Sequence, residues 1–378
     1  MFTLLKNANL YAPEPMGKKD VLICQHLIAH IADHIDSTGL PGPCDIMDLE
    51  GAILAPGLID QHIHLIGGGG EGGFHSRTPQ VTLSKLAQAG ITTVVGVMGT
   101  DGTTRSQRDL FAKAKALETE GITAYMHTGS YEVPTRTITG AIRDDLVFLD
   151  NVLGVKIALA DHRCSFPTTD ELARIVADIR IAGMIAGKKG LLHIHMGELA
   201  QPFAQINALL DKGLSIKHFS PTHVSRAPHV FDEAICFAKR GGYIDMTPDA
   251  SYADPVDLLY QALEAGVPAS QITFSSDGNG SMPVFNQSGT LTGITAAPVN
   301  ACIKTLAKLR ESGMPFEKAI AFFTKNVAAS LGITKGSIQI GSSADLIVFN
   351  EKTLPANVIS KGQALLKDNE LITQGTFE

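Results

Sequence analysis

The sequence predicts an α/β fold: a (β/α)8 TIM barrel with a small discontinuous β domain built from both termini. Short apolar runs rich in β-branched residues alternate with amphipathic helical stretches from residue 52 onward. Eight such runs occur, and eight parallel strands linked by helices close into a barrel. The two ends of the chain instead carry short strand-like pieces separated by turns. Two all-β flanks around a barrel most simply pair with each other.

The predicted strands and helices follow one another in a regular order. The strands span 58–65, 91–99, 122–129, 152–160, 191–197, 217–224, 243–247 and 272–276. The helices between them span 79–89, 105–120, 169–186, 202–212, 228–240 and 255–265. Several helices end at a glycine just before the next strand, such as Gly90 or Gly121, as helix C-termini often do. A barrel is favoured over an open doubly wound sheet, because no G-x-G-x-x-G follows the first strand and polar residues collect at the ends of many strands.

The length of the chain supports this two-part organisation. At 378 residues it exceeds one ordinary domain, and a barrel of about 250 residues plus a small accessory unit accounts for it. We assign residues 52–335 to the barrel. Residues 1–51 and 336–378 are assigned together to the β domain.

Composition excludes several classes of protein. Hydrophobic residues make up 44% of the chain and charged residues 18%, which indicates a large core rather than disorder. With a net charge of −7 and no run of Lys or Arg, we expect no nucleic-acid partner. No uncharged apolar stretch of about 20 residues and no signal peptide is evident, so we expect no membrane partner. Five scattered cysteines fit reduced thiols, and we expect a cytoplasmic protein.

A His-x-His pair ends the first predicted strand. His62 and His64 follow an apolar stretch, and side chains two apart on a strand point to the same face. An extended pair of this kind can chelate one metal ion. Two histidines on one face can equally be satisfied by buried hydrogen bonds, so the pair needs further ligands to indicate a metal site.

Further candidate ligands lie on later strands, toward the ends where barrel enzymes carry their active sites. Lys156 lies inside the apolar fourth strand, where a charged amine is expensive to bury without a partner or a chemical role. His193 and His195 share one face of the fifth strand, and we assign His195 as the ligand and His193 as a core or supporting residue. His223 ends the sixth strand and Asp277 the eighth. Imidazole and carboxylate ligands together indicate zinc or a similar divalent ion.

This set of residues resembles the amidohydrolase superfamily, and within it the isoaspartyl dipeptidases. The resemblance covers essentially the whole chain. It is carried by the segments 57–71, 131–140, 161–163, 221–226, 275–281 and 341–348. The metal motifs are shared by many hydrolases, whereas the glycine-rich loop around Glu71 and the segment after Tyr131 are more specific. Glu198 departs from the family pattern, in which Asp is expected.

The resemblance implies an enzyme with a binuclear zinc site. The six implied ligands are His62, His64, Lys156, His195, His223 and Asp277. Lys156 would be carboxylated by carbon dioxide and bridge both ions as a carbamate, which removes the problem of a buried cation. Asp277 would accept the proton of the attacking bridging hydroxide and donate it to the departing amine. Tyr131 would donate a hydrogen bond to the developing oxyanion.

The implied substrate is a small zwitterionic dipeptide with a β-aspartyl (isoaspartyl) bond. Glu71 is the implied partner of its free ammonium, and Arg163 and Arg226 can each bind one of its two carboxylates. Short-range contacts would come from Gly69, Gly70, Thr100 and Ser281. We also expect a homo-oligomer.

Two alternatives stay open at this stage. The first is another amidohydrolase, acting on cyclic amides as dihydroorotases and hydantoinases do, or on N-acyl amino acids. The loop that carries Glu71 argues against it, because a cyclic amide offers no free ammonium. The second is a non-catalytic assembly protein, which would be expected to have lost metal ligands that this chain retains.

Overall fold

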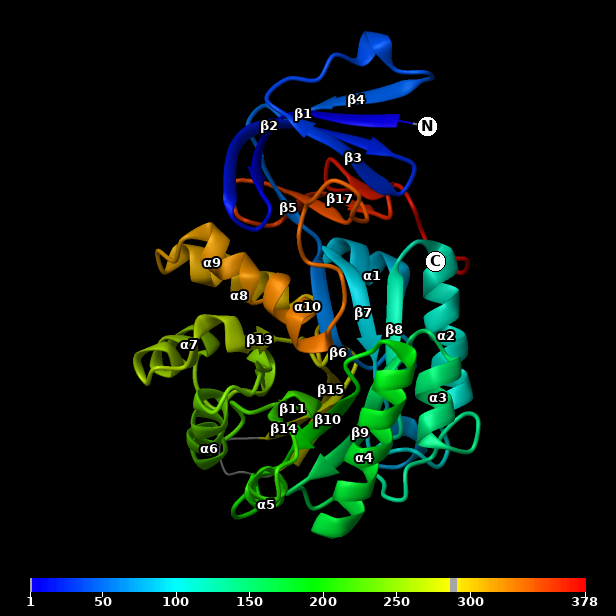
Figure 1. Ribbon diagram of the computed structural model, residues 1–378, viewed down its shortest axis with the longest axis vertical. Coiled ribbons are helices and arrows are strands. Elements are labelled where there is room, and N and C mark those ends of the chain that lie inside the picture. The colour runs from blue at the N-terminus through cyan, green and yellow to red at the C-terminus, as the bar shows by residue number, and fades with distance from the viewer. Residues whose placement is uncertain (1, 286–290) are drawn as a thin grey trace.

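The computed structural model describes residues 2–285 and 291–378. A barrel surrounded by helices forms the larger part, and a β sheet covers one end of it (Figure 1). The strands of both chain ends lie together in this covering sheet. None of the helices in the described part of the chain is long and apolar enough to cross a membrane.

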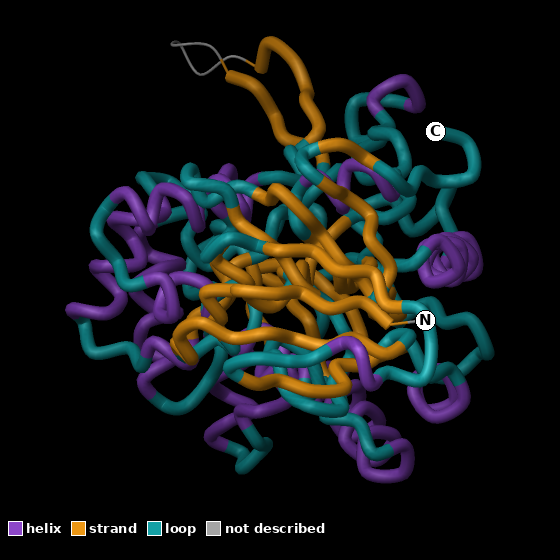
Figure 2. The backbone as a smooth tube through the Cα atoms, turned by 90° about the horizontal axis from the view of Figure 1, so that it is seen from above, coloured by secondary structure: helices purple, strands orange, loops and turns teal. Residues whose placement is uncertain are grey.

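Eight parallel strands form the barrel, in the order in which they follow one another along the chain. They are β6 (Leu58–Ile63), β7 (Ile91–Gly96), β8 (Thr123–Thr128), β9 (Val152–Leu159), β10 (Leu191–Met196), β11 (Phe219–Thr222), β12 (Ile244–Met246) and β13 (Ile272–Phe274). Each lies within a strand range that the sequence predicts. Viewed from above, strands of the covering sheet lie in front of the middle of the molecule, and helices lie around the strands (Figure 2). The predicted fold class is confirmed.

The barrel closes between its first and last strands just beyond the end of β13. Ile63 and Gly278 form an isolated parallel bridge. The Asp277 amide donates to the His62 carbonyl at 3.1 Å, and the His64 amide donates to the Gly278 carbonyl at 2.9 Å. The hydrogen bonds that close the barrel therefore involve the same residues that the sequence proposes as metal ligands.

Six helices of the structure lie within the predicted ranges. They are α1 (Leu83–Gln88), α2 (Gln107–Glu120), α4 (Thr169–Ala186), α5 (Ala204–Asp211), α6 (Pro228–Lys239) and α7 (Pro255–Glu264). The capping box of Thr168 and Glu171 fixes the start of α4. Four further helices lie outside those ranges: α3 (Ile142–Phe148), α8 (Ala301–Glu311), α9 (Phe316–Ala321) and α10 (Lys325–Leu331). Three of these four span only one or two turns, too few for a clear helical periodicity.

The covering sheet combines strands from both ends of the chain. Its members are β1 (Phe2–Tyr11), β2 (Pro15–Cys24), β3 (Leu27–Ala32), β4 (Cys44–Asp48), β5 (Ile53–Pro56), β16 (Leu346–Phe349), β17 (Pro355–Ser360), β18 (Gln363–Lys367) and β19 (Glu370–Leu371). Antiparallel pairing of β5 with β16 joins the N-terminal and C-terminal strands. The sheet includes β5, which the sequence places on the barrel side of the boundary at residue 51. Whether 1–51 with 336–378 and 52–335 are the limits of separate folding units stays a prediction.

A hairpin of β14 (Ser281–Phe285) and β15 (Leu291–Ala296) follows the last barrel strand and is not predicted from the sequence. It extends away from the body of the molecule (Figure 2). Short 3-10 helices complete the secondary structure: η1 (Ser37–Gly39), η2 (Phe74–Ser76), η3 (Ile216–His218), η4 (Pro248–Ala250) and η5 (Ala269–Gln271). Ser281, one of the substrate-binding residues that the sequence proposes, begins this hairpin.

Phe316 of α9 anchors the covering sheet to the helices of the barrel. Its ring centroid lies 4.8 Å from that of Tyr11 in β1 and 5.3 Å from that of Phe349 in β16, both edge-on. The Phe316 side chain is almost fully buried. One aromatic side chain therefore packs against strands from both ends of the chain.

We expect Phe316→Ala to lower the free energy of unfolding by about 3–5 kcal/mol, because it leaves a cavity where the two parts meet. Urea unfolding followed by circular dichroism would measure this change. Phe148→Ala is the matched control, since Phe148 at the end of α3 is 73% exposed and its loss should change stability by no more than about 0.5 kcal/mol. Equal effects of the two substitutions would contradict the anchoring role of Phe316.

Candidate active site

A cavity of about 590 Å³ lies at the C-terminal ends of the barrel strands. Ten of the residues that the sequence proposes line it: His64, Gly69, Glu71, Thr100, Tyr131, Arg163, His195, Arg226, Asp277 and Ser281. His62, Lys156 and His223 are buried beside this wall. The position and volume of the cavity are those expected of a small-molecule site in a barrel enzyme.

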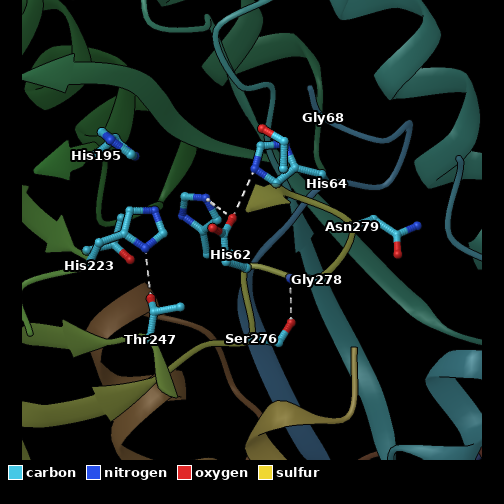
Figure 3. A network of polar contacts seen from close by, with 12 residues as sticks. His62, His64, Gly68, His195, His223, Thr247, Ser276, Gly278 and Asn279 are labelled. Atoms are coloured by element: carbon cyan, nitrogen blue, oxygen red, sulfur yellow. Dashed lines mark hydrogen bonds and ion pairs between the residues drawn. The ribbon is translucent and has the colours of Figure 1, made fainter. Parts of the chain in front are cut away.

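His62, His64 and Asp277 form a cluster that could hold a metal ion. One donor atom from each lies within 4.8 Å of the others. The Oδ1 atom of Asp277 lies 3.4 Å from Nε2 of His62 and 3.1 Å from Nε2 of His64. Figure 3 shows the two imidazoles side by side. Burial would raise the pKa of Asp277, but neighbouring His223 and His64 lower it to about 2. The carboxylate is therefore charged at neutral pH.

Lys156 lies next to this cluster, fully buried in β9. Its Nζ atom is 3.3 Å from Nε2 of His62. Among the described residues, this amine forms no direct ion pair with a carboxylate, and Asp277 and Asp245 attract it only from a longer distance. Burial lowers the pKa of Lys156 to about 7, which makes the neutral amine abundant near neutral pH. The neutral amine is the form that can react with carbon dioxide.

His223 and His195 continue the row of imidazoles. The ring of His223 lies 4.7 Å from that of His62 and 4.7 Å from that of His195, measured between centroids. His223 hydrogen-bonds through Nδ1 to Oγ1 of Thr247 at 2.8 Å, which leaves Nε2 for a metal (Figure 3). Burial lowers the pKa of His62, His195 and His223 well below the usual range, so these rings are neutral, the form that binds metals.

The donor set fits a divalent metal centre. Neutral imidazoles, a carboxylate and a buried amine meet in one place, and Nδ1 of His64 is buried without a hydrogen-bond partner. A buried group of acceptors is unfavourable unless a cation or donors satisfy it. All six proposed ligands are brought together by the fold, although their roles as ligands stay predictions.

His193 supports the cluster through a contact with His62. Its Nε2 atom lies 2.8 Å from Nδ1 of His62, and its Nδ1 atom lies 3.0 Å from Oγ of Ser220. The ring also stacks on His127 of β8, with centroids 4.9 Å apart. His127 is not among the residues that the sequence proposes. It faces inward from a barrel strand, as His193 does.

Tyr131 follows β8 and faces the cavity. Its hydroxyl lies 2.6 Å from Nδ1 of His195. Burial raises the pKa of Tyr131 above its usual range, so the hydroxyl stays protonated. It is therefore available as a hydrogen-bond donor beside the metal cluster.

Three other proposed substrate-binding residues contact the Glu71 carboxylate. The hydroxyl of Thr100 donates to Oε1 of Glu71 at 3.0 Å, and the hydroxyl of Ser281 donates to Oε2 at 3.3 Å. Nη1 of Arg163 donates to the same carboxylate at 3.3 Å. The Glu71 side chain is 29% exposed and borders the cavity. Glu71 is thus a fixed, accessible acceptor rather than a freely moving loop acid.

The loop that carries Glu71 is held by contacts that are not predicted from the sequence. Buried Arg105 donates to the carbonyls of Ile66 and, at 2.7 Å, of Gly68. Gly69 has a φ of 74°, and a Cβ there would lie 2.4 Å from the Ser76 carbonyl oxygen, so this position requires glycine. Gly70 is next in the loop but is not part of the cavity wall.

A second carboxylate, Asp161, holds both candidate arginines near His195. Arg163 donates to Asp161 from Nε and Nη2 at 2.9 Å each, and Nη1 of Arg226 lies 3.8 Å away. Nε2 of His195 is 2.9 Å from Oδ2 of Asp161. Burial would raise the pKa of Asp161, but hydrogen bonds from Arg163 and His195 lower it below its usual range. The sequence assigns no role to Asp161, although it directly follows the fourth predicted strand.

Comparisons with known proteins show the family of this chain. Residues 53–365 match the Amidohydrolase family. A crystal structure of a beta-aspartyl dipeptidase from Fervidobacterium islandicum AW-1, in complex with beta-Asp-Leu dipeptide, is 42% identical, with a TM-score of 0.93 and coverage of 98% of this chain and 97% of that one. A second structure from the same organism is 41% identical with a TM-score of 0.90, and covers 98% of each chain. An imidazolonepropionase from Pseudomonas syringae pv. tomato is 27% identical over 354 residues, 80% of each chain.

Proposed function

Because the chain belongs to the amidohydrolase family and is a hydrolase, we propose that it cleaves the β-aspartyl (isoaspartyl) peptide bond of small dipeptides. One observation carries the proposal. Glu71, fixed by Thr100 and Ser281, faces the same cavity as the pair of His64 and Asp277. A binding point for an ammonium group thus lies in one small cavity with a candidate metal centre. The similarity to beta-aspartyl dipeptidases supports the same substrate class.

The charged residues of the cavity match the charged groups of such a dipeptide. A β-aspartyl dipeptide carries a free α-ammonium, the α-carboxylate beside it, and a second carboxylate on the leaving residue. The Glu71 carboxylate accepts hydrogen bonds from the ammonium. Arg163 and Arg226 border the cavity and supply donors for the two carboxylates. An α-linked dipeptide places its ammonium and carboxylate differently relative to the scissile bond, so this arrangement disfavours it.

Two divalent ions, which we propose to be zinc, would complete the site. The residues that would hold them are His62, His64, Lys156 as a carbamate, His195, His223 and Asp277. When bound, such ions make a shared water acidic and polarise the scissile carbonyl.

The residues of the chain provide the proton transfers and the charge stabilisation. Asp277 is ionised and borders the cavity, so its carboxylate accepts a proton from the attacking water. It then donates this proton to the nitrogen of the leaving residue as the C–N bond breaks. The protonated hydroxyl of Tyr131 donates a hydrogen bond to the carbonyl oxygen as negative charge develops on it, a contribution of about 3–4 kcal/mol in comparable sites.

We expect the purified enzyme to hydrolyse β-Asp-Leu and to leave α-Asp-Leu intact, because only the former presents its ammonium to Glu71. Amino-acid release measured by chromatography over a panel of β-linked and α-linked dipeptides would test this. Cyclic amides and N-acyl amino acids belong in the panel, since the same family could act on them. Comparable turnover of both dipeptides, or turnover of cyclic amides alone, would refute the proposed substrate class.

Lys156→Ala should abolish hydrolysis, because it removes the proposed bridging carbamate. Addition of a small carboxylic acid such as formate should restore part of the activity, since the acid can occupy the vacated position. Elemental analysis should find about two divalent ions per chain in the wild-type protein and fewer in the variant. Full activity of the variant without added acid would rule out the carbamate.

Glu71→Gln should lower kcat/KM for β-Asp-Leu about 10- to 150-fold, as expected from the loss of a charged hydrogen bond of about 1.5–3 kcal/mol. The metal content should not change, because Glu71 touches no proposed ligand except through Arg163. Glu132→Gln is a matched control: Glu132 also pairs with an arginine, Arg136 at 2.9 Å, but lies outside the cavity wall. Equal rates for the two variants would remove Glu71 from ammonium binding.

A further inference from the structure

We propose that Asp161 is a positioning residue that fixes one tautomer of the metal-ligand candidate His195 and, with the same carboxylate, orients Arg163 toward the substrate. The inference rests on the proposed function, which assigns His195 to metal binding and Arg163 to substrate binding. It gives a role to Asp161, to which neither the sequence motifs nor the family similarity assigns one. Through Asp161, the metal centre and the substrate-binding charges form one continuous set of contacts.

The contact between Asp161 and His195 determines which nitrogen of the ring is protonated. Both side chains are about 95% buried, and Oδ2 of Asp161 lies 2.9 Å from Nε2 of His195. An ionised carboxylate only accepts hydrogen bonds, so Nε2 must carry the proton. A neutral imidazole has a single N–H, and Nδ1 therefore keeps a free lone pair. This nitrogen lies 2.6 Å from the Tyr131 hydroxyl, and both side chains line the cavity.

Arg226 also approaches Nε2 of His195, with Nη1 at 2.8 Å. A guanidinium only donates, so Arg226 would favour the opposite tautomer. That tautomer would leave lone pairs of Asp161 and His195 facing each other at 2.9 Å in a buried position. Nη1 of Arg226 has another acceptor, the Met196 carbonyl at 2.8 Å, and so does not depend on the ring. The Asp161 contact therefore determines the tautomer.

The same carboxylate binds Arg163 in a fork. Nε and Nη2 of Arg163 donate to Oδ1 and Oδ2 of Asp161 at 2.9 Å each, and the Arg163 amide donates to Oδ1 at 2.8 Å. This bidentate geometry fixes the plane of the guanidinium. It leaves Nη1 to reach Glu71 at 3.3 Å. Contacts thus run from His195 through Asp161 and Arg163 to the proposed ammonium-binding acid.

The backbone places Asp161 against the end of the neighbouring strand. Ala160 just before it has a φ of 53°, and the Ala160 carbonyl accepts a hydrogen bond from the Leu199 amide at 2.8 Å. At Gly197, two residues after His195, a Cβ would lie 2.1 Å from the Ala160 carbonyl oxygen and 2.4 Å from Cα of Asp161. Glycine at 197 permits this approach. Asp161 is therefore positioned by the fold and does not reach His195 by chance rotation of a flexible side chain.

Asp161→Asn tests the proposal through metal binding. Partners that orient a metal-ligating histidine typically contribute 10- to 100-fold to metal affinity. We expect the variant to bind one of its two Zn²⁺ ions about 10- to 100-fold more weakly, measured by competition with a chromophoric chelator on metal-free protein. KM for β-Asp-Leu should rise as well, because Arg163 loses its fork. Asp161→Glu should recover part of the Zn²⁺ affinity, which a merely structural defect would not.

Glu198→Gln is the matched control. Glu198 is also a carboxylate that contacts Arg226, with Oε1 3.3 Å from Nε, but it is 60% exposed and has no contact with His195. The Glu198→Gln variant should bind Zn²⁺ with the same affinity as the wild-type protein. Wild-type Zn²⁺ affinity at both sites in Asp161→Asn would overturn the proposal, whatever the activity of that variant. Because this readout needs no substrate, failure of the wild-type protein to cleave β-Asp-Leu would refute the proposed function separately.

A measurement on the unaltered protein covers the case in which Asp161→Asn does not fold. Nitrogen-15 spectra of protein labelled at histidine distinguish the two tautomers of a neutral ring, and comparison with His195→Gln identifies the His195 signals. The proton should lie on Nε2 of His195. A proton on Nδ1 would overturn the assignment of Asp161 as the residue that sets the tautomer.

Discussion

Closure of the barrel is the constraint on which the candidate site depends. The segment after β13 meets the end of β6 through backbone hydrogen bonds, from Asp277 to His62 and from His64 to Gly278. These bonds hold the backbone of Asp277 beside His62 and His64, and the Asp277 side chain contacts both imidazoles. Asp277 has a φ of 54°, a left-handed conformation that aspartate tolerates better than most residues. The candidate metal cluster thus lies at the seam of the barrel, where backbone hydrogen bonds join the first and last strands.

A buried polar network within the barrel supports this arrangement. The Asp245 carboxylate on β12 accepts hydrogen bonds from Gln61 at 2.6 Å, Thr222 at 2.6 Å, Thr273 at 2.9 Å and Ser275 at 2.5 Å. These residues belong to β6, β11, β13 and the segment after β13, so a single acid ties the strands on either side of the seam. A buried carboxylate that is fully hydrogen-bonded is tolerated, whereas loss of one donor leaves it partly unsatisfied. The network therefore stabilises the neighbouring strand ends, which carry candidate metal ligands.

The three acids of the cavity differ in their partners, although Arg163 contacts both Asp161 and Glu71. Asp277 lies among histidines, Asp161 is held by Arg163 and His195, and Glu71 is held by two hydroxyls and a single guanidinium nitrogen. Glu71 is the most exposed of the three and has the weakest partners. An acid in this position keeps acceptor capacity for an incoming ammonium. Asp161, which is almost fully buried, instead holds groups of the protein itself.

The sequence by itself predicted the order of the eight barrel strands, and its resemblance to the amidohydrolase superfamily implied the six candidate ligands. The two-residue period of a strand is enough to place His62 and His64 on one face, and a lysine inside the apolar strand β9 is conspicuous on its own. Parallel strands in a barrel bring such residues to one end without further information. Residues outside this periodicity, such as those of the β14–β15 hairpin and the short helix α3, gave no comparable signal.

Only the tertiary structure decided which atoms meet. Asp161 lies in a turn, where no periodicity indicates a direction, and its link to His195 arises because the turn after β9 packs against Gly197 beyond β10. Arg105 reaches the Glu71 loop through backbone carbonyls that carry no sequence signature. The support of His62 by His193 likewise depends on two strands meeting in register. Sequence period specifies faces and strand ends, whereas hydrogen bonds between turns depend on distances that only the closed barrel sets.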